Sequence, residues 1–158
     1  MNRREFLRAV TGVVAVASAP AAAALALSSA PACKRELRCK HCGMRIDPAS
    51  AWRADLVDDG GHVTSFDTPR CALQSWRSGA TPAKTLLFQE YYERRARDGR
   101  DVRFVIGGDV AGPMGADLVP VDPARSAKFI QDHGAERALT LDEVTLEVLG
   151  AIGGHTSK

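Results

Sequence analysis

The stretch VTSFDTPRCALQSW, residues 63–76, has the pattern from which the fold is predicted. A short apolar run precedes an aspartate, a proline and a segment in which apolar residues recur at helical spacing, so we expect a β-strand that leads directly into an α-helix. Asp67 is the expected N-cap and Pro69 falls in the first helical turn. Gly79 marks the expected end of the helix.

A second stretch, LVPVDPARSAKFIQD at residues 118–132, repeats this order of features. It has a strand-like run, Asp122 as the expected cap, Pro123 at the first helical position and an amphipathic segment that stops at Gly134. The two stretches therefore predict that the chain contains two related structural units.

Strand-like segments surround each of these stretches. Residues 52–59 and 62–67 alternate apolar and polar side chains on either side of Gly60-Gly61, which is typical of a hairpin. Residues 101–108 and 116–122 flank the glycine-rich turn DVAGPMG. We therefore predict an α+β protein made of two pseudo-duplicated β-β-α(-β) units with small antiparallel or mixed sheets.

The remaining segments complete these two halves, which we place at about residues 39–95 and 100–152. Residues 83–92 are expected to form a strand, although the residues that follow favour a helix. Thr140 and Glu143 have the spacing of a capping box before a last helix that reaches about Ile152.

The first 32 of the 158 residues have the features of an export signal. A positively charged start is followed by an alanine-rich apolar run and a small-residue A-P-A end. The paired Arg3 and Arg4 indicate a twin-arginine signal that is cleaved, and a membrane anchor is the alternative. Residues 33–158 are then the mature domain, and we expect it in the periplasm.

Cleavage after Ala32 makes Cys33 the new N-terminus and a candidate for lipid attachment, which would tie the protein to the membrane. The signal holds three arginines and one glutamate of the 21 basic and 19 acidic residues, so the mature part has 18 of each and is neutral. This balance gives no indication of nucleic-acid binding.

The motif CKHCGM, residues 39–44, packs two thiols, an imidazole and a thioether into six positions. A C-x-x-C pair is found in redox-active disulfides, but here it precedes a hairpin rather than an amphipathic helix. It is also half of a zinc ribbon site, which Cys71 with His62 or His133 could complete in space.

The methionines favour a softer metal. Apart from the initiator, the chain has only Met44, just after the thiol pair, and Met114, in the turn AGPMGAD. Neither lies in an apolar periodic run, although both could still pack beneath a loop. Thiolate and thioether ligands together favour Cu(I). Cys71, whose pKa we expect the helix N-terminus to lower, and His41 are weaker candidate ligands.

Taken together, CKHCGM, FDTPRCALQSW and GPMGADLVPVDPARSAKFIQDHGA resemble the NosL family of exported accessory proteins of nitrous oxide reductase. The resemblance extends from about Cys39 to Val144. Its most specific parts are the C-x-x-C-G-M motif and the later M-G-A followed by a helix that ends in H-G-A.

The resemblance implies a copper-binding metallochaperone without catalysis. Such a protein delivers Cu(I) for maturation of nitrous oxide reductase or a related copper enzyme, together with a membrane ABC transporter and periplasmic assembly proteins. The implied fold has two similar β-β-α-β units and is related to organomercurial lyase. Carried over to this chain, the implied copper ligands are Cys39, Cys42, Met44 and Met114, with Cys71 and His41 as weaker candidates.

Other classes of protein remain open on the sequence. A periplasmic thiol-disulfide oxidoreductase, or an enzyme like organomercurial lyase, would use the cysteines as nucleophiles. A structural zinc domain that bridges other proteins is a third interpretation.

Overall fold

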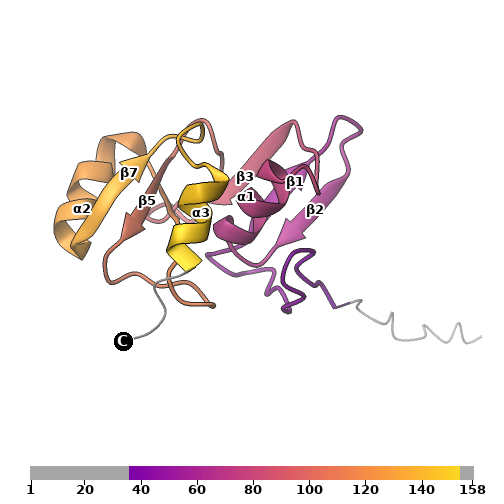
Figure 1. Ribbon diagram of the computed structural model, residues 1–158, viewed down its shortest axis with the longest axis horizontal. Coiled ribbons are helices and arrows are strands. Elements are labelled where there is room, and N and C mark those ends of the chain that lie inside the picture. The colour runs from indigo at the N-terminus through magenta and orange to yellow at the C-terminus, as the bar shows by residue number, and fades with distance from the viewer. Residues whose placement is uncertain (1–35, 154–158) are drawn as a thin grey trace, which may run out of the picture. The chain divides into compact units, whose positions relative to one another are not determined.

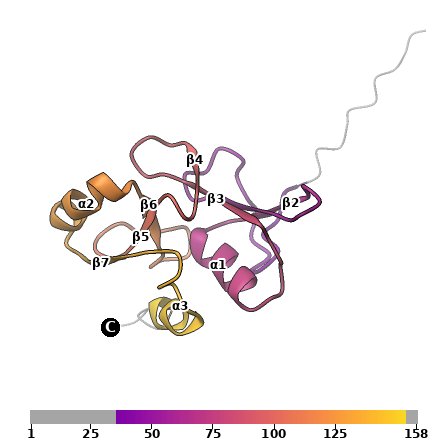
Figure 2. The ribbon, with the colours of Figure 1, turned by 90° about the horizontal axis from the view of Figure 1, so that it is seen from above.

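The computed structural model describes residues 36–153, which form two small sheets and three α-helices (Figures 1 and 2). The sheets have the strand orders β2-β1-β3-β4 and β6-β5-β7, and every strand pair is antiparallel. The elements are β1 (Ala54–Val57), β2 (Val63–Phe66), α1 (Pro69–Arg77), β3 (Thr85–Gln89), β4 (Ala96–Asp98), β5 (Arg103–Gly107), β6 (Val119–Val121), the 3-10 helix η1 (Pro123–Arg125), α2 (Ser126–His133), β7 (Ala135–Leu139) and α3 (Leu146–Gly153).

The two halves share one topology. In each half the first strand is central, the second pairs on one side of it, and the chain returns through a helix to place the third strand on the other side. The predicted α+β fold with two small antiparallel sheets is confirmed, and the first half adds the edge strand β4. The predicted signal at residues 1–32, and Cys33, lie outside the described residues. Within the described part, no helix is long and apolar enough to cross a membrane.

The first hairpin forms where the glycine pair predicts it. Ala54 pairs with Phe66 at the open end of β1 and β2. At the closed end, one carboxylate oxygen of Asp58 accepts hydrogen bonds from the N–H groups of Gly60 and His62, both at 2.9 Å. This local bonding closes the turn.

The start of α1 differs from the prediction by one residue. Thr68, not Asp67, is the N-cap, because Thr68 is extended and its hydroxyl accepts the N–H of Cys71 at 3.3 Å. A second acceptor comes from the other half of the chain. The carboxylate of Asp117 accepts the N–H of Arg70 at 3.0 Å. The first turn of α1 is thus capped from two directions, and Asp67 is left outside the helix.

The helix of the second half begins and ends as predicted. Asp122 accepts the N–H of Ala124 at 2.9 Å, and Gly134 takes the left-handed conformation at the C-terminus, with φ of 60°. The first turn is the 3-10 helix η1, and α2 continues from Ser126.

Two predicted boundaries are wrong. The carboxylate of Glu143 accepts both the N–H and the hydroxyl of Thr140, at 2.7 and 2.8 Å, but this bonding closes a turn, and α3 begins only at Leu146. The helix-prone residues after β3 form a turn instead, which leads to β4. In both places the carboxylate of a glutamate, Glu143 or Glu90, accepts a local backbone N–H, and this bonding competes with a helix.

A shared core joins the halves. Phe88 of β3 and Phe104 of β5 meet edge to face, with their ring centroids 5.0 Å apart, and both are fully buried. Helices α1 and α3 lie side by side over this core (Figures 1 and 2). A second cluster around Phe129 packs α2 against the sheet of the second half.

A buried carboxylate also connects the halves. Glu90, just after β3, is fully buried, and its two oxygens accept the N–H of Glu93 at 2.6 Å and the N–H of Asp122 at 3.1 Å. Close by, Tyr91 donates its N–H to the carbonyl of Pro120 in β6 at 2.9 Å. The turn after β3 is therefore fixed to the second half at two points.

Replacing Glu90 by alanine is expected to lower the free energy of unfolding by about 1–3 kcal/mol, because two partly buried N–H groups lose their acceptors. Urea denaturation followed by circular dichroism measures the change. Glu147→Ala, at an exposed position of α3, is the matched control and should change stability by less than about 0.5 kcal/mol. Equal effects of the two variants would show that Glu90 does not hold the halves together.

Candidate metal centre

Three cysteine sulfurs lie together at the start of α1. The sulfurs of Cys39, Cys42 and Cys71 are all within 4.8 Å of one another, and none of the three forms a disulfide. Cys39 and Cys71 are almost fully buried, whereas Cys42 is partly exposed. Among the His, Cys, Asp and Glu residues of positions 36–153, this is the group whose spacing suits a shared metal ion.

The first two cysteines are held by a tight turn. Arg38 and Arg45 form an antiparallel bridge, and between them the N–H of Cys39 donates to the carbonyl of Met44 at 2.8 Å. The N–H of Gly43 donates back to the carbonyl of Cys39 at 2.9 Å, and Gly43 has φ of 76°, a conformation that favours glycine. The G of CKHCGM is therefore required for the turn that brings the two thiols together.

The surroundings of Cys39 favour its charged form. The thiol of Cys71 donates a hydrogen bond to the Cys39 sulfur, and the backbone N–H groups of Asp67, Cys42 and His41 also point at it. These donors outweigh burial and lower the pKa of Cys39 to about 4. Cys39 is therefore a thiolate at neutral pH.

The other two thiols keep their protons. The hydrogen bond to Cys39 is the main reason why the pKa of Cys71 is raised, and burial adds to it. Burial is the main reason for the raised pKa of Cys42, against a backbone hydrogen bond from Met44. The expectation that the helix N-terminus lowers the pKa of Cys71 is wrong, because the neighbouring thiolate has the larger effect.

Asp67, which the sequence had assigned to helix capping, lies instead against the thiol group. Asp67 is buried, and its backbone N–H donates to the sulfur of Cys39. Burial, and then the charge of Cys39, raise the pKa of the Asp67 carboxyl. Within residues 36–153, its Oδ2 has no hydrogen-bond partner. The sequence signal for the position of Asp67 was the Thr-Pro pair that follows it. Thr68 can cap the helix itself, which leaves Asp67 to contact Cys39.

Both methionines are displayed on loops rather than packed in the core. Met44 is 49% exposed and Met114 is 40% exposed. Met44 lies two residues beyond Cys42, and Met114 sits in a turn closed by backbone hydrogen bonds between Gly112 and Gly115, at 2.8 and 3.0 Å. The alternative that they fill space beneath a loop is wrong.

The loop that carries Met114 is anchored beside the cysteines. It ends at Asp117, whose carboxylate accepts the N–H of Arg70, the residue next to Cys71. The same oxygen accepts the N–H of Leu118 at 2.8 Å. The loop of the second half is therefore attached to the helix that supplies the third thiol.

The histidines lie apart from the thiol group. The side chain of His41 is exposed, and only its backbone N–H faces Cys39. His62 lies in the turn between β1 and β2. His133 bonds to Asp109 at 2.8 Å and packs on Phe129. Neither His62 nor His133 completes a zinc site with Cys71.

The thiol group has the dimensions of a soft-metal site. A metal–thiolate bond of about 2.3 Å places three sulfurs in a trigonal plane about 4 Å apart. The sulfurs of the three cysteines lie within 4.8 Å of one another, which exceeds that spacing by less than about 1 Å. Zinc usually takes four protein ligands in a structural site, and the group contains three residues. The arrangement suits a thiophilic ion that accepts three ligands.

Fold and site define a small α+β protein with a candidate soft-metal centre built from three cysteines. Residues 31–149 match the model of the NosL family, and the chain belongs to this family. The fold is similar to that of the crystal structure of the copper chaperone NosL from Shewanella denitrificans, with 18% identity, a TM-score of 0.57, and coverage of 70% of this chain and 90% of that chain. At this identity the comparison shows the fold alone. No curated protein matches the sequence.

The thiolate of Cys39 is expected to persist on acidification until about pH 4. An unfolded thiol titrates near pH 8.5, so this thiolate stabilises the fold fully above about pH 8.5, and the contribution is lost as the pH falls toward 4. Ultraviolet thiolate absorbance of the reduced, metal-free Cys33→Ser protein measures the titration. Cys71→Ala removes the main donor and should raise the pKa of Cys39. An ordinary thiol titration in the parent protein would contradict the geometry.

Proposed function

We propose that this chain is an exported Cu(I)-binding metallochaperone, which delivers copper for maturation of nitrous oxide reductase or a related copper enzyme. Its copper centre is formed by Cys39, Cys42 and Cys71. Cys71, a weaker candidate on the sequence alone, becomes a principal ligand because its sulfur lies with the other two.

The observation that carries this proposal is the group of three thiols at the start of α1. One of them is already a thiolate, and backbone N–H groups face it. Binding of copper displaces the protons that Cys71 and Cys42 hold, since the metal takes the thiolate form. Three soft sulfur ligands with no fourth His, Cys, Asp or Glu in the group, among the described residues, favour Cu(I) over Zn(II).

The exposed thioethers of Met44 and Met114 have a separate role in the proposal. They lie at the surface, whereas the thiols of Cys39 and Cys71 are buried. Met114 is on the loop that Asp117 attaches to α1. The methionines hold copper weakly at the surface, where a partner can deliver it or take it away, and the thiols retain it.

Family membership supports the assignment of client and partners. The NosL family matches three quarters of this chain, and the similar crystal structure is that of a copper chaperone. The proposed partners are the copper enzyme itself, a membrane ABC transporter and periplasmic assembly proteins. Delivery of an ion needs no chemical step on a substrate, so the protein acts without catalysis.

A thiol-disulfide oxidoreductase is the competing function, and the lowered pKa of Cys39 is the observation that favours it. Against it, the C-x-x-C pair lies in a turn before β1 and not at the start of a helix. Catalysis of insulin reduction at rates typical of redox enzymes would support the competitor and contradict the copper proposal.

Anaerobic titration with Cu(I) and with Zn(II), each against a chelator of known affinity, tests the copper centre. The mature protein is expected to bind one Cu(I) far more tightly than Zn(II). Cys71→Ser should weaken Cu(I) binding by more than about a hundredfold. Loss of a residue that only hydrogen-bonds to a metal ligand already lowers metal affinity by about 10- to 100-fold. The control is His41→Ala, which removes an exposed side chain next to Cys42 and should leave the affinity unchanged. Equal losses in both variants would exclude the proposed ligand set.

The thioether role is tested in the same titrations with Met114→Leu. Leucine is close in size and the position is partly exposed, so the melting temperature should stay within a few degrees. Copper transfer to a second chelator should slow, whereas sulfur scattering from copper held at the thiol centre, measured by X-ray absorption, should stay unchanged. Unchanged transfer would remove Met114 from the copper path.

Export is part of the proposal and rests on the sequence. The twin-arginine pattern at Arg3 and Arg4 directs the chain to the periplasm, and Cys33 at the mature N-terminus is the candidate site for a lipid anchor. Replacing both arginines by lysine is expected to leave precursor in the cytoplasm, detected by cell fractionation. Normal export of this variant would rule out the twin-arginine route.

A further inference from the structure

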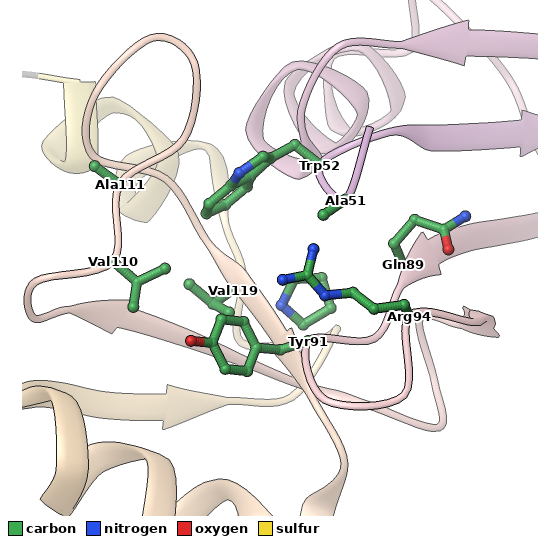
Figure 3. A pocket seen from close by; sticks show the side chains of 9 residues that line it. Ala51, Trp52, Gln89, Tyr91, Arg94, Val110, Ala111 and Val119 are labelled. Atoms are coloured by element: carbon green, nitrogen blue, oxygen red, sulfur yellow. The ribbon is translucent and has the colours of Figure 1, made fainter. Parts of the chain in front are cut away.

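A pocket of about 170 Å³ is lined by residues of both halves (Figure 3). One wall is Trp52, just before β1, and another is Tyr91, in the turn after β3. Val110 and Ala111, in the loop between β5 and β6, form a third side. Arg94, which is exposed, also lines the pocket, and we call this site the Arg94 pocket.

The backbone of Arg94 has an unusual conformation. Its φ is 54°, and among residues 36–153 it is the only non-glycine residue with a positive φ. The N–H of Arg94 donates to the carbonyl of Glu90 at 2.9 Å, and the N–H of Glu90 donates to the carbonyl of Arg95 at 2.9 Å, so the turn is fixed. Glycine would take this conformation without strain. An arginine here therefore lowers the stability of the fold. Strained residues of this kind cluster at functional sites, which points to a function for the Arg94 side chain.

The guanidinium of Arg94 has no carboxylate partner among the described residues. Its neighbours differ, since Arg95 pairs with Glu93 at 2.6 Å and Arg97 with Asp122 at 3.6 Å. Instead, the guanidinium of Arg94 lies 5.8 Å from the ring centroid of Tyr91. Figure 3 shows it between Tyr91 and Trp52. The pocket thus combines aromatic and aliphatic walls with one cation that is free to pair.

The pocket and the thiol group share a structural element. Val110 and Ala111 belong to the loop that carries Met114 and ends at Asp117. A side chain at Gly112 would approach Trp52 to 3.4 Å, so the loop lies against the pocket wall. Asp117 in turn bonds to the first turn of α1, beside Cys71. A molecule bound in the pocket would therefore contact the loop that we propose handles copper.

The size of the pocket indicates what it can hold. Small-molecule and cofactor sites usually measure about 300–1,000 Å³. At about 170 Å³, the Arg94 pocket has room for one side chain. Its apolar walls suit an aliphatic or aromatic group, and the unpaired guanidinium of Arg94 suits a carboxylate beside that group.

We infer that the Arg94 pocket docks a segment of the copper-receiving protein in which an apolar side chain is followed by an acidic residue. The apolar side chain packs on the aliphatic side of the pocket, at Val110 and Val119. The carboxylate pairs with the guanidinium of Arg94, between Trp52 and Tyr91. This inference rests on the proposed copper delivery, because it assigns the surface by which the recipient is held next to the Met114 loop. Docking there places the recipient against the path of the ion.

Nuclear magnetic resonance titration of the metal-free, reduced protein tests the inference. The probes are N-acetyl-Leu-Asp-amide and the neutral N-acetyl-Leu-Asn-amide. Both should shift the indole N–H of Trp52 and the backbone N–H of Val110, and the aspartyl probe should bind about two- to fivefold more tightly, as expected for an exposed ion pair. Arg94→Gly should make the two affinities equal, while its melting temperature stays the same or rises because glycine relieves the strain.

Arg95→Ala is the matched control, since it removes the adjacent exposed arginine and should preserve the preference for the aspartyl probe. Arg94→Asn, which also tolerates positive φ, replaces Arg94→Gly if that variant does not fold. Equal affinity of the parent protein for both probes would overturn the inference. So would the same shifts with acetate alone, which would identify a small-anion site. The titration needs no copper, so its failure leaves the copper measurements unaffected, and failed copper binding leaves this result standing.

Discussion

The carboxylate of Asp117 is the constraint on which the candidate centre depends. It belongs to the second half of the chain but caps the helix of the first half, through the N–H of Arg70. Its side chain is almost fully buried, and burial raises the pKa of its carboxyl. Because Cys71 is in the same helical turn, the position of its thiol is fixed by a residue that lies far away in sequence. A fragment containing only the first half would contain all three cysteines of the centre without this restraint.

The elements that could be predicted are those with local signals. The hairpin at Gly60-Gly61 and the helix that ends at Gly134 have turn and capping residues whose effect extends over a few positions. The place of Cys71 had no such signal, because 28 residues separate it from Cys42 and only folding brings them together. The position of Asp67 outside the helix could not be predicted for a related reason. Where two good capping residues follow one another, tertiary contacts decide which of them caps the helix.

The three thiols form one hydrogen-bonded group rather than three independent ligands. Cys39 has lost its proton because Cys71 donates to it, and Cys71 keeps its proton for the same reason. These hydrogen bonds are consistent with the close spacing of the three sulfurs, which all lie within 4.8 Å of one another. The orientation of the donor is set by the backbone of α1 and by the turn at Gly43. The close spacing of the three sulfurs is therefore a property of the folded scaffold and not of the C-x-x-C motif by itself.

The proline in β6 has a consequence for how the protein meets other chains. Pro120 lies opposite Phe104 in the edge strand, and its carbonyl is already taken by the N–H of Tyr91. A proline has no N–H to offer, so this edge of the sheet cannot be extended by a strand from a neighbouring molecule. The second sheet is thereby protected on this side against edge-to-edge aggregation. Recognition on this side must use side chains and pockets instead of added strands.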